Sequence, residues 1–289
     1  ENSSFFSKEQ QEDLLYDFYE ARQDIWEWKA HVMRSENQER AKQEAIKIID
    51  KSTALVTMDW AMKFQCQKYR EKQSEWFGKR GLSWHVSSVL LKDPDTDDVV
   101  VHTYVHLFDS CSQDWFTVVS VLEDLLEQLK KRHPQLQKVY LKSDEAGCYH
   151  NTFTLISINT IGKRVGIRIQ GYDYSEPNHG KDICDRIICP MKSSIRRYCD
   201  EGHDIESAAA MREALYKKPV KGVTAAVCSV NEQRRSLNAK KIPQISTYHS
   251  FRYEEDGIRV WKAYSVGPGK LIKFGSLLKC SQGPTALSV

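Results

Sequence analysis

The order of strand-like and helix-like segments between residues 53 and 202 constrains the fold more than any other feature of the sequence. Three runs rich in β-branched and apolar residues come first, at 53–64, 81–92 and 99–109, which predicts an antiparallel meander. An amphipathic helix follows, from the N-cap Asp114 to Pro134. The later segments are predicted as a strand at 138–144, a helix at 148–162, a strand at 165–175 and a helix at 181–202.

Three regions are expected on this basis. Residues 1–52 form an N-terminal helical region with two helices, 53–202 form a mixed α/β core, and 203–289 form a C-terminal extension of helix and strands. The sequence begins with Glu1 rather than Met, so we expect it to be part of a longer chain.

Composition excludes several classes of protein. With 40% hydrophobic and 28% charged residues, the chain is expected to be folded and not a membrane protein, because no window approaches 18 apolar residues. The eight cysteines form no C-x-x-C pair, so we expect reduced thiols in the nucleus, with the cytoplasm as the alternative. No nucleotide-binding G-x-x-x-x-G-K-[ST] loop and no H-E-x-x-H occurs.

Acidic residues fall at the ends of the predicted elements. Asp59 lies inside an otherwise apolar first strand, Asp144 ends the fourth strand, and Asp182 and Asp185 open the helix after the fifth. This element order is that of the ribonuclease H-like fold, a five-stranded mixed sheet in which the first and fourth strands are adjacent and the last helix packs beside them. We therefore expect Asp59, Asp144 and Asp185 to converge at one edge of the sheet.

Converging carboxylates repel one another unless a cation lies between them. Mg²⁺ is held by one or two carboxylates plus substrate phosphate, and two ions stabilise both oxygens of an in-line displacement at phosphorus. The pattern thus predicts Mg²⁺ or Mn²⁺, with two ions, and phosphodiester chemistry. The alternative is structural, because an Asp at a helix start, Asp182 above all, is often an N-cap.

Three segments carry a resemblance to a known family: TALVTMDWAMKF, VYLKSDEAGCYHNT and DYSEPNHGKDICDR. They resemble the catalytic blocks of ribonuclease H-like (DDE/D) transposases of eukaryotic DNA transposons, Mutator-like or related, and of host proteins derived from them. HGKDICDR is similar to their HGK-x-x-CD block. The resemblance covers about residues 53–202 and implies that Asp59, Asp144 and Asp185 are the catalytic acids.

The sequence departs from this family at the third acid. Many such transposases have Glu there, so Asp182, which is also a candidate metal ligand, and Glu176 are alternatives to Asp185. The large helical insertion before the last helix and a zinc-finger module are absent, and a zinc site is not expected. Cys148 and His150 are similar to a Cys-then-His element of some transposase groups and, with Glu176, are possible accessory residues; the alternative for the first two is a small buried residue and a polar group at a helix start.

Basic and aromatic side chains suggest where nucleic acid would bind. Lys181, Lys192 and Arg196 lie near the expected metal site and are candidates for phosphate contacts, although such residues also occur on ordinary solvated helix faces. We expect Trp26, Trp28, Trp60 and Trp76 to fill the core, with base stacking as the alternative.

The sequence as a whole predicts a metal-dependent nuclease or DNA strand transferase of transposase type. DNA is the expected partner and RNA is the alternative. A homo-oligomer is a further possibility. The alternative is a domesticated, catalytically inactive module that binds nucleic acid or a protein partner through the same fold.

Overall fold

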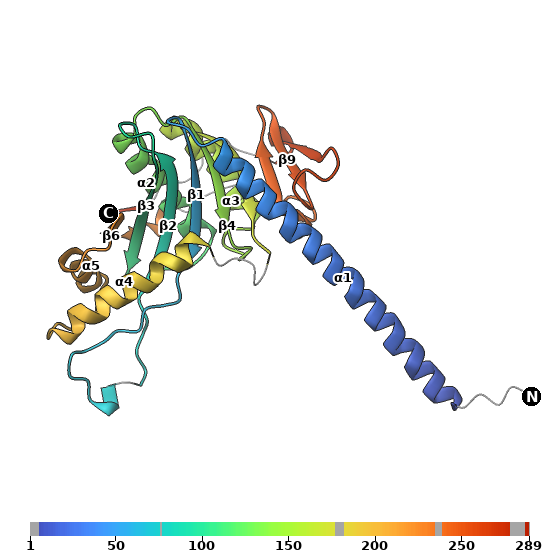
Figure 1. The fold of residues 1–289 in the computed structure, drawn as a ribbon, viewed down its shortest axis with the longest axis horizontal. Coiled ribbons are helices and arrows are strands. Elements are labelled where there is room, and N and C mark those ends of the chain that lie inside the picture. The colour runs from blue at the N-terminus through green and yellow to red at the C-terminus, as the bar shows by residue number, and fades with distance from the viewer. Residues whose placement is uncertain (1–5, 76, 177–181, 235–238, 278–286, 289) are drawn as a thin grey trace, which may run out of the picture.

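The computed structural model describes residues 6–75, 77–176, 182–234, 239–277 and 287–288, and its centre is a nine-stranded mixed sheet (Figure 1). The strand order is β10-β9-β8-β5-β4-β1-β2-β3-β6. The strands of this sheet are β1 Thr53–Trp60, β2 Ser83–Lys92, β3 Val99–Phe108, β4 Lys138–Ser143, β5 Arg168–Tyr174, β6 Val223–Val227, β8 Ser250–Tyr253, β9 Gly257–Trp261 and β10 Lys270–Lys273. A separate pair is formed by β7 Ser229–Val230 and β11 Leu287–Ser288.

The inner five strands have the predicted arrangement. β1, β2 and β3 form an antiparallel meander, and β4 lies parallel to β1 on its other side, followed by β5. The β1–β4 register places Met58 beside Ser143. The carboxyl ends of β1 and β4 therefore meet at one edge of the sheet, as expected.

The expectation of a five-stranded sheet is wrong, because both edges of the inner five strands are extended. β8 pairs antiparallel with β5 and is followed by β9 and β10, while β6 pairs parallel with β3. An edge strand leaves a row of unpaired backbone N–H and C=O groups, which further strands can satisfy. Residues beyond 202 thus complete the same sheet.

Helices cover both faces of the sheet. The first core cluster joins Val56 and Met58 to leucines of α2 and isoleucines of α3, and the second joins Trp84 and Val86 to α4 and α5. The two clusters lie on opposite faces of the sheet, because successive side chains along a strand point to alternate faces. The helices are α1 Lys8–Lys47, α2 Trp115–Arg132, α3 Thr152–Val165, α4 Ile183–Asp200, α5 Ala208–Lys217 and α6 Phe274–Leu277, with short 3-10 turns at Gln73–Glu75, Glu232–Arg234 and Ile245–Thr247.

The N-terminal region is one helix of 40 residues, so the prediction of two helices is wrong. Its C-terminal part lies on the body, where Gln38, Ala41 and Ala45 are buried, and its N-terminal half extends away from it (Figure 1). Trp26 and Trp28 are 63% and 64% exposed. Their expected place in the core is therefore wrong, because no element of the described chain reaches that half of α1.

The other two tryptophans differ. Trp60 is half-buried and packs against the rings of His85 and Phe108, whereas Trp76 lies outside the described residues. None of the described helices has the length and apolar character needed to cross a membrane.

Candidate functional site

The structure brings Asp59, Asp144 and Asp185 together along one cavity of about 460 Å³. Asp59 is the penultimate residue of β1, and Asp144 directly follows β4. Asp185 lies in the first turn of α4. The thiol of Cys184 donates to the carbonyl oxygen of Thr57 at 3.2 Å, which fixes the start of α4 against β1.

The carboxylates of this cavity destabilise one another's ionised form. Burial, followed by the negative charges of Asp144 and Asp185, raises the pKa of Asp59 to about 7. Asp144 is more exposed as a residue, yet loss of hydration, with the charges of Glu145 and Asp185, raises the pKa of its carboxyl as well. Within the described part of the chain, no Lys, Arg or His side chain forms an ion pair with any of these three aspartates.

Asp182 lines the same cavity but has partners of its own. Its Oδ1 accepts from Lys42 at 2.9 Å and from the backbone N–H of Ile183, and its Oδ2 accepts from Lys142 at 2.7 Å. Burial would raise the pKa of Asp182, but the two lysines outweigh it and bring the pKa to about 2. Asp182 is the N-cap of α4, and both of its carboxylate oxygens already have a cationic partner.

Glu176 anchors α1 to the end of β5. Its carboxylate accepts from Arg34 at 2.8 and 3.1 Å, from Gln38 at 3.2 Å, and pairs with Nδ1 of His31 at 2.8 Å. Its backbone N–H donates back to the amide oxygen of Gln38. Only 2% of the Glu176 side chain is exposed, so this carboxylate is enclosed by α1.

Cys148 and His150, two of the possible accessory residues, lie just past Asp144, before α3 begins. Burial, with the charge of Asp144, raises the pKa of the half-buried Cys148 to about 12, so its thiol stays protonated at neutral pH. His150 lies with Nδ1 3.0 Å from Oε1 of Glu145 and packs on the ring of Tyr174.

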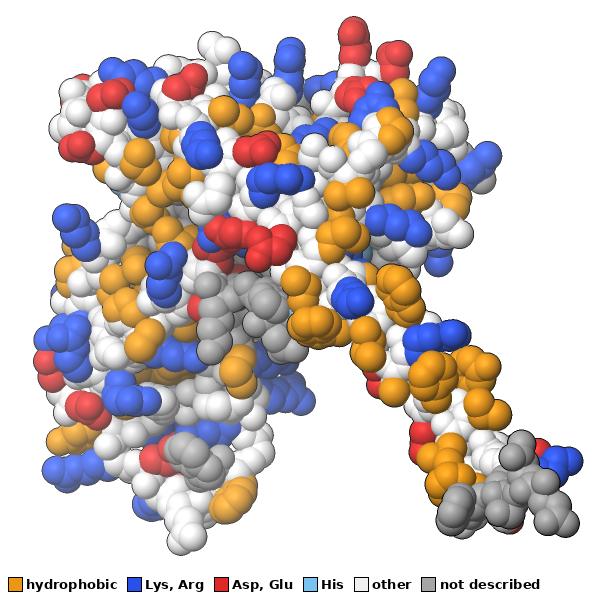
Figure 2. Space-filling view, turned by 45° about the vertical axis from the view of Figure 1, so that its right-hand side comes forward, with side chains coloured by type: hydrophobic (Ala, Val, Ile, Leu, Met, Phe, Trp, Pro, Cys, Tyr) orange, Lys and Arg blue, Asp and Glu red, His pale blue; other side chains and the backbone are white. Residues whose placement is uncertain are grey.

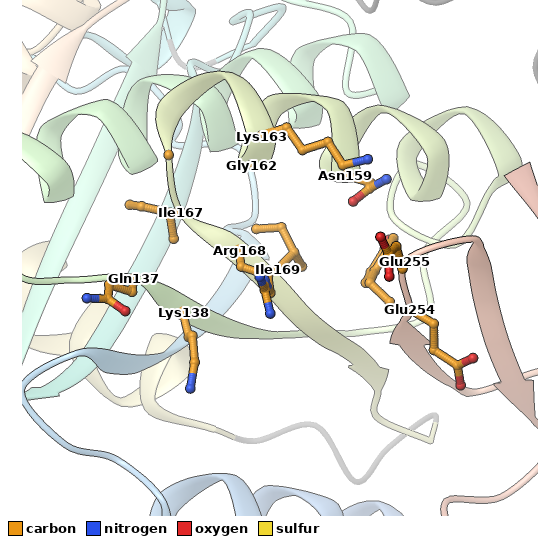
Figure 3. Close-up of a pocket in the computed structure, with 12 residues that line it drawn as sticks. Gln137, Lys138, Asn159, Gly162, Lys163, Ile167, Arg168, Ile169, Glu254 and Glu255 are labelled. Carbon is orange, nitrogen blue, oxygen red and sulfur yellow. The ribbon is translucent and has the colours of Figure 1, made fainter.

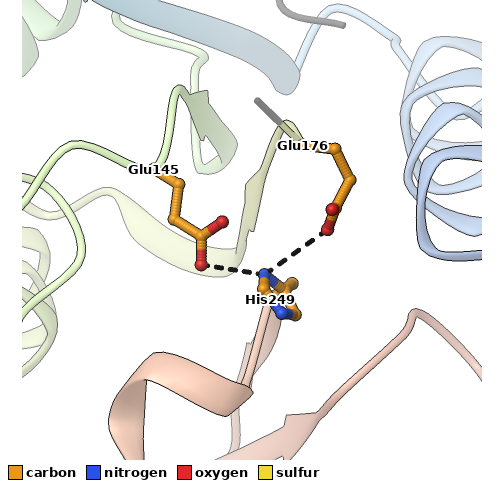
Figure 4. Close-up of side chains that lie close together, drawn as sticks. All are labelled: Glu145, Glu176 and His249. Carbon is orange, nitrogen blue, oxygen red and sulfur yellow. Dashed lines mark ion pairs between the residues drawn. The ribbon is translucent and has the colours of Figure 1, made fainter. Parts of the chain in front are cut away.

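A second group of possible metal-ligand residues, Glu145, Glu176 and His249, places one donor atom of each within 4.8 Å of the others (Figure 4). Nδ1 of His249 lies 2.9 Å from Oε1 of Glu145 and 3.7 Å from Oε1 of Glu176. Burial would raise the pKa of Glu145, but His150 and His249 outweigh it and lower the pKa to about 2. These carboxylates are therefore already engaged by side chains of the protein.

Three residues that contact the predicted acids were not expected from the sequence: His249, Lys42 and Lys142. His249 precedes β8 and lies beside Glu145 and Glu176 because β8 pairs with β5. The local signal for Lys142 was its place in the predicted strand that ends at Asp144, where a lysine is buried only if it finds an acid.

The expected nucleic-acid contacts are only partly described. Lys192 and Arg196 are exposed on α4, and neither lines the acidic cavity. Lys181 lies outside the described residues.

A larger cavity of about 840 Å³ lies at the other end of the same strands (Figure 3). Lys138 and Arg168, at the starts of β4 and β5, line it together with Glu254 and Glu255. It contains none of the predicted site residues.

Fold and site together define a mixed α/β protein with an acidic cavity at the carboxyl ends of two parallel strands. The chain belongs to the family described as Domain of unknown function (DUF8701), whose model matches residues 38–265. No curated protein matches the sequence.

Two similar solved structures are of the human cytomegalovirus terminase nuclease domain. One, soaked with Mn and inhibitor-bound, is 10% identical, covers 63% of this chain and 73% of that chain, and has a TM-score of 0.24. The other is 12% identical to this chain, covers 63% of this chain and 74% of its own, and also has a TM-score of 0.24.

Proposed function

We propose that the chain is a metal-dependent nuclease or DNA strand transferase with a ribonuclease H-like core, acting at the cavity lined by Asp59, Asp144 and Asp185. One observation carries the proposal. These three carboxylates share a cavity and form no ion pair with the described residues, whereas the neighbouring Asp182 and Glu176 are neutralised by lysine and arginine.

The donor set fits Mg²⁺ or Mn²⁺, which prefer carboxylate oxygens. Asp59 and Asp144 would hold two ions between them, and Asp185 would complete the shell of the second. When bound, the ions would neutralise the acids and stabilise the attacking and leaving oxygens at a phosphodiester. Asp182 keeps a positioning role, because through Lys42 and Lys142 it ties the start of α4 to α1 and β4.

The substrate follows from the resemblance to transposases and from the basic residues. DNA is proposed as the partner, with Lys192, Arg196 and Lys181 contacting its phosphates and RNA as the other substrate to test. A nuclear location and descent from a transposon belong to the same proposal. The competing function is an inactive module that retains the fold.

Calorimetric titration with Mn²⁺ tests the metal site directly. Wild type, Asp59→Asn and Asp144→Asn are compared with Asp95→Asn, a matched control in the exposed β2–β3 turn. We expect the first two substitutions to weaken Mn²⁺ binding by about tenfold or more, and the control to leave it unchanged. Cleavage of labelled single- and double-stranded DNA and RNA is followed in parallel.

The outcomes separate the two functions. Binding that depends on Asp59 and Asp144, together with metal-dependent cleavage, supports the nuclease or transferase. Binding without cleavage of any substrate supports the inactive module. No binding to the wild-type chain would overturn the metal site.

A further inference from the structure

The free half of α1 is unusual for a helix in water, because every residue from 6 to 29 is exposed. An unsupported helix is only marginally stable, since most helical stability in proteins comes from packing an apolar face. Figure 2 shows hydrophobic side chains along this protruding helix. A surface of this kind marks an interaction site.

One set of the exposed apolar residues follows a heptad pattern, while Leu15, Tyr16, Tyr19 and Trp26 lie outside it. The residues of this set recur at alternating spacings of four and three, which is typical of the seam of a left-handed coiled coil. The seam residues are Leu14, Phe18, Ala21, Ile25, Trp28 and Val32.

Most of this seam, from Leu14 to Trp28, lies on the exposed half of α1, whereas its last residue, Val32, is 40% exposed and lines a cavity of about 310 Å³ with Lys142 and Ser175. Ala41, which is buried against the body, follows Val32 by nine residues, or about two and a half helical turns, so the two point in opposite directions. A second helix can therefore lie along the seam from Leu14 to Trp28 without displacing the contacts of α1 with the sheet.

The charges beside the seam identify the partner. With Phe18 and Ile25 at position a, Asp17 and Asp24 occupy position g, and Arg22 and Lys29 occupy position e. In a parallel pair, g of one helix meets e of the next heptad on the other, so Asp17 meets Arg22 and Asp24 meets Lys29 of a second copy. In an antiparallel pair, like charges would meet.

The overall charge of this segment disfavours other partners. Residues 8–29 contain seven acidic and three basic residues. Phosphate backbones and anionic membranes attract basic helices, and would repel this one.

We propose that residues 11–33 of α1 form a parallel two-stranded coiled coil with a second copy of the chain. Parallel pairing puts both bodies at the same end of the stalk, and thus both acidic cavities on one side of the dimer. The proposal does not depend on the metal chemistry, because none of the seam residues lines that cavity.

Two tryptophans of equal exposure provide a matched test. Trp28 lies in the seam, and Trp26 lies at position b outside it. In sedimentation velocity, the wild-type chain is expected at twice the mass of a single chain. Trp28→Ala should weaken the dimer by about tenfold or more in Kd, and Trp26→Ala by much less. A monomeric wild type, or equal effects of both substitutions, would overturn the proposal.

Charge exchange tests the orientation. Asp17→Lys/Asp24→Lys and Arg22→Glu/Lys29→Glu each place like charges opposite one another in a parallel homodimer, and should each be largely monomeric. Mixing the two variants should restore a heterodimer. If instead both variants dimerise as strongly as wild type, the helices are antiparallel, because an antiparallel wild-type pair already places like charges opposite one another. An unchanged unfolding midpoint of the body confirms that each variant is folded.

Discussion

Asp59 and Asp144 stand at the same level on two adjacent parallel strands, each one residue past the paired Met58 and Ser143. Neighbouring parallel strands lie about 4.8 Å apart, so two carboxylates here repel each other. Burial, followed by the charge of Asp144, raises the pKa of Asp59, and burial with the charges of Glu145 and Asp185 raises the pKa of Asp144. The arrangement costs stability unless a cation is bound.

Replacing Asp59 should therefore stabilise the metal-free chain. In chelated buffer at pH 8, Asp59→Asn is expected to raise the free energy of unfolding by about 1 kcal/mol, because it removes a partly buried charge from beside two others. Urea denaturation measures this change. Adding Mn²⁺ should stabilise wild type but not the variant. If Asp59→Asn were less stable than wild type in the absence of metal, Asp59 would have a favourable structural partner in the fold.

The core and its acids could be predicted because their signals are local. Periodicity locates β1, β4 and α4, and an element order like that of the ribonuclease H-like fold predicts that the first and fourth strands are adjacent, which brings Asp59 and Asp144 together. The position of Asp182 before an amphipathic helix likewise predicted that it is the N-cap of α4.

What the sequence did not predict depends on long-range pairing. His249 joins Glu145 only through the addition of β8 to the sheet edge, and Lys42 reaches Asp182 across 140 residues. Trp26 and Trp28 were misplaced because an apolar stripe shows that a helix needs a partner, not that the same chain supplies it.

The attachment of α1 should depend on Glu176. Glu176→Gln removes the charge that holds Arg34 and His31, and is expected to cost about 2–3 kcal/mol of stability, since Arg34 is left partly buried without its carboxylate. Faster limited proteolysis within α1 should accompany the loss. Glu36→Gln, at an exposed position of the same helix, is the control. Equal cleavage of both variants would contradict an anchoring role.

The added edge of the sheet depends on a buried ion pair between β5 and β8. Arg252 donates two hydrogen bonds of 2.9 Å to the carboxylate of Asp173, which is buried. Arg252→Met should cost about 3 kcal/mol, because it leaves that carboxylate unpaired. Chemical denaturation measures the loss, with the exposed Arg212→Met on α5 as control. A loss below about 1 kcal/mol would show that water replaces Arg252.

The lysine pair at Asp182 predicts a specific dependence of stability on pH. The pKa of Asp182 is lowered to about 2 from its ordinary 3.8, so its ionised form stabilises the fold above about pH 4, and this contribution is lost as the pH falls towards 2. The difference corresponds to about 2 kcal/mol. Asp182→Asn should lose this amount of stability at pH 7, together with a further cost that does not vary with pH in this range, because Lys142 stays buried without its partner.

Urea denaturation between pH 3 and 7 measures this dependence. The difference in the free energy of unfolding between wild type and Asp182→Asn should become smaller at the acid end. Asp200→Asn, an exposed position at the end of α4, is the control. If this difference in the free energy of unfolding stayed constant with pH, the lysines would not set the ionisation of Asp182.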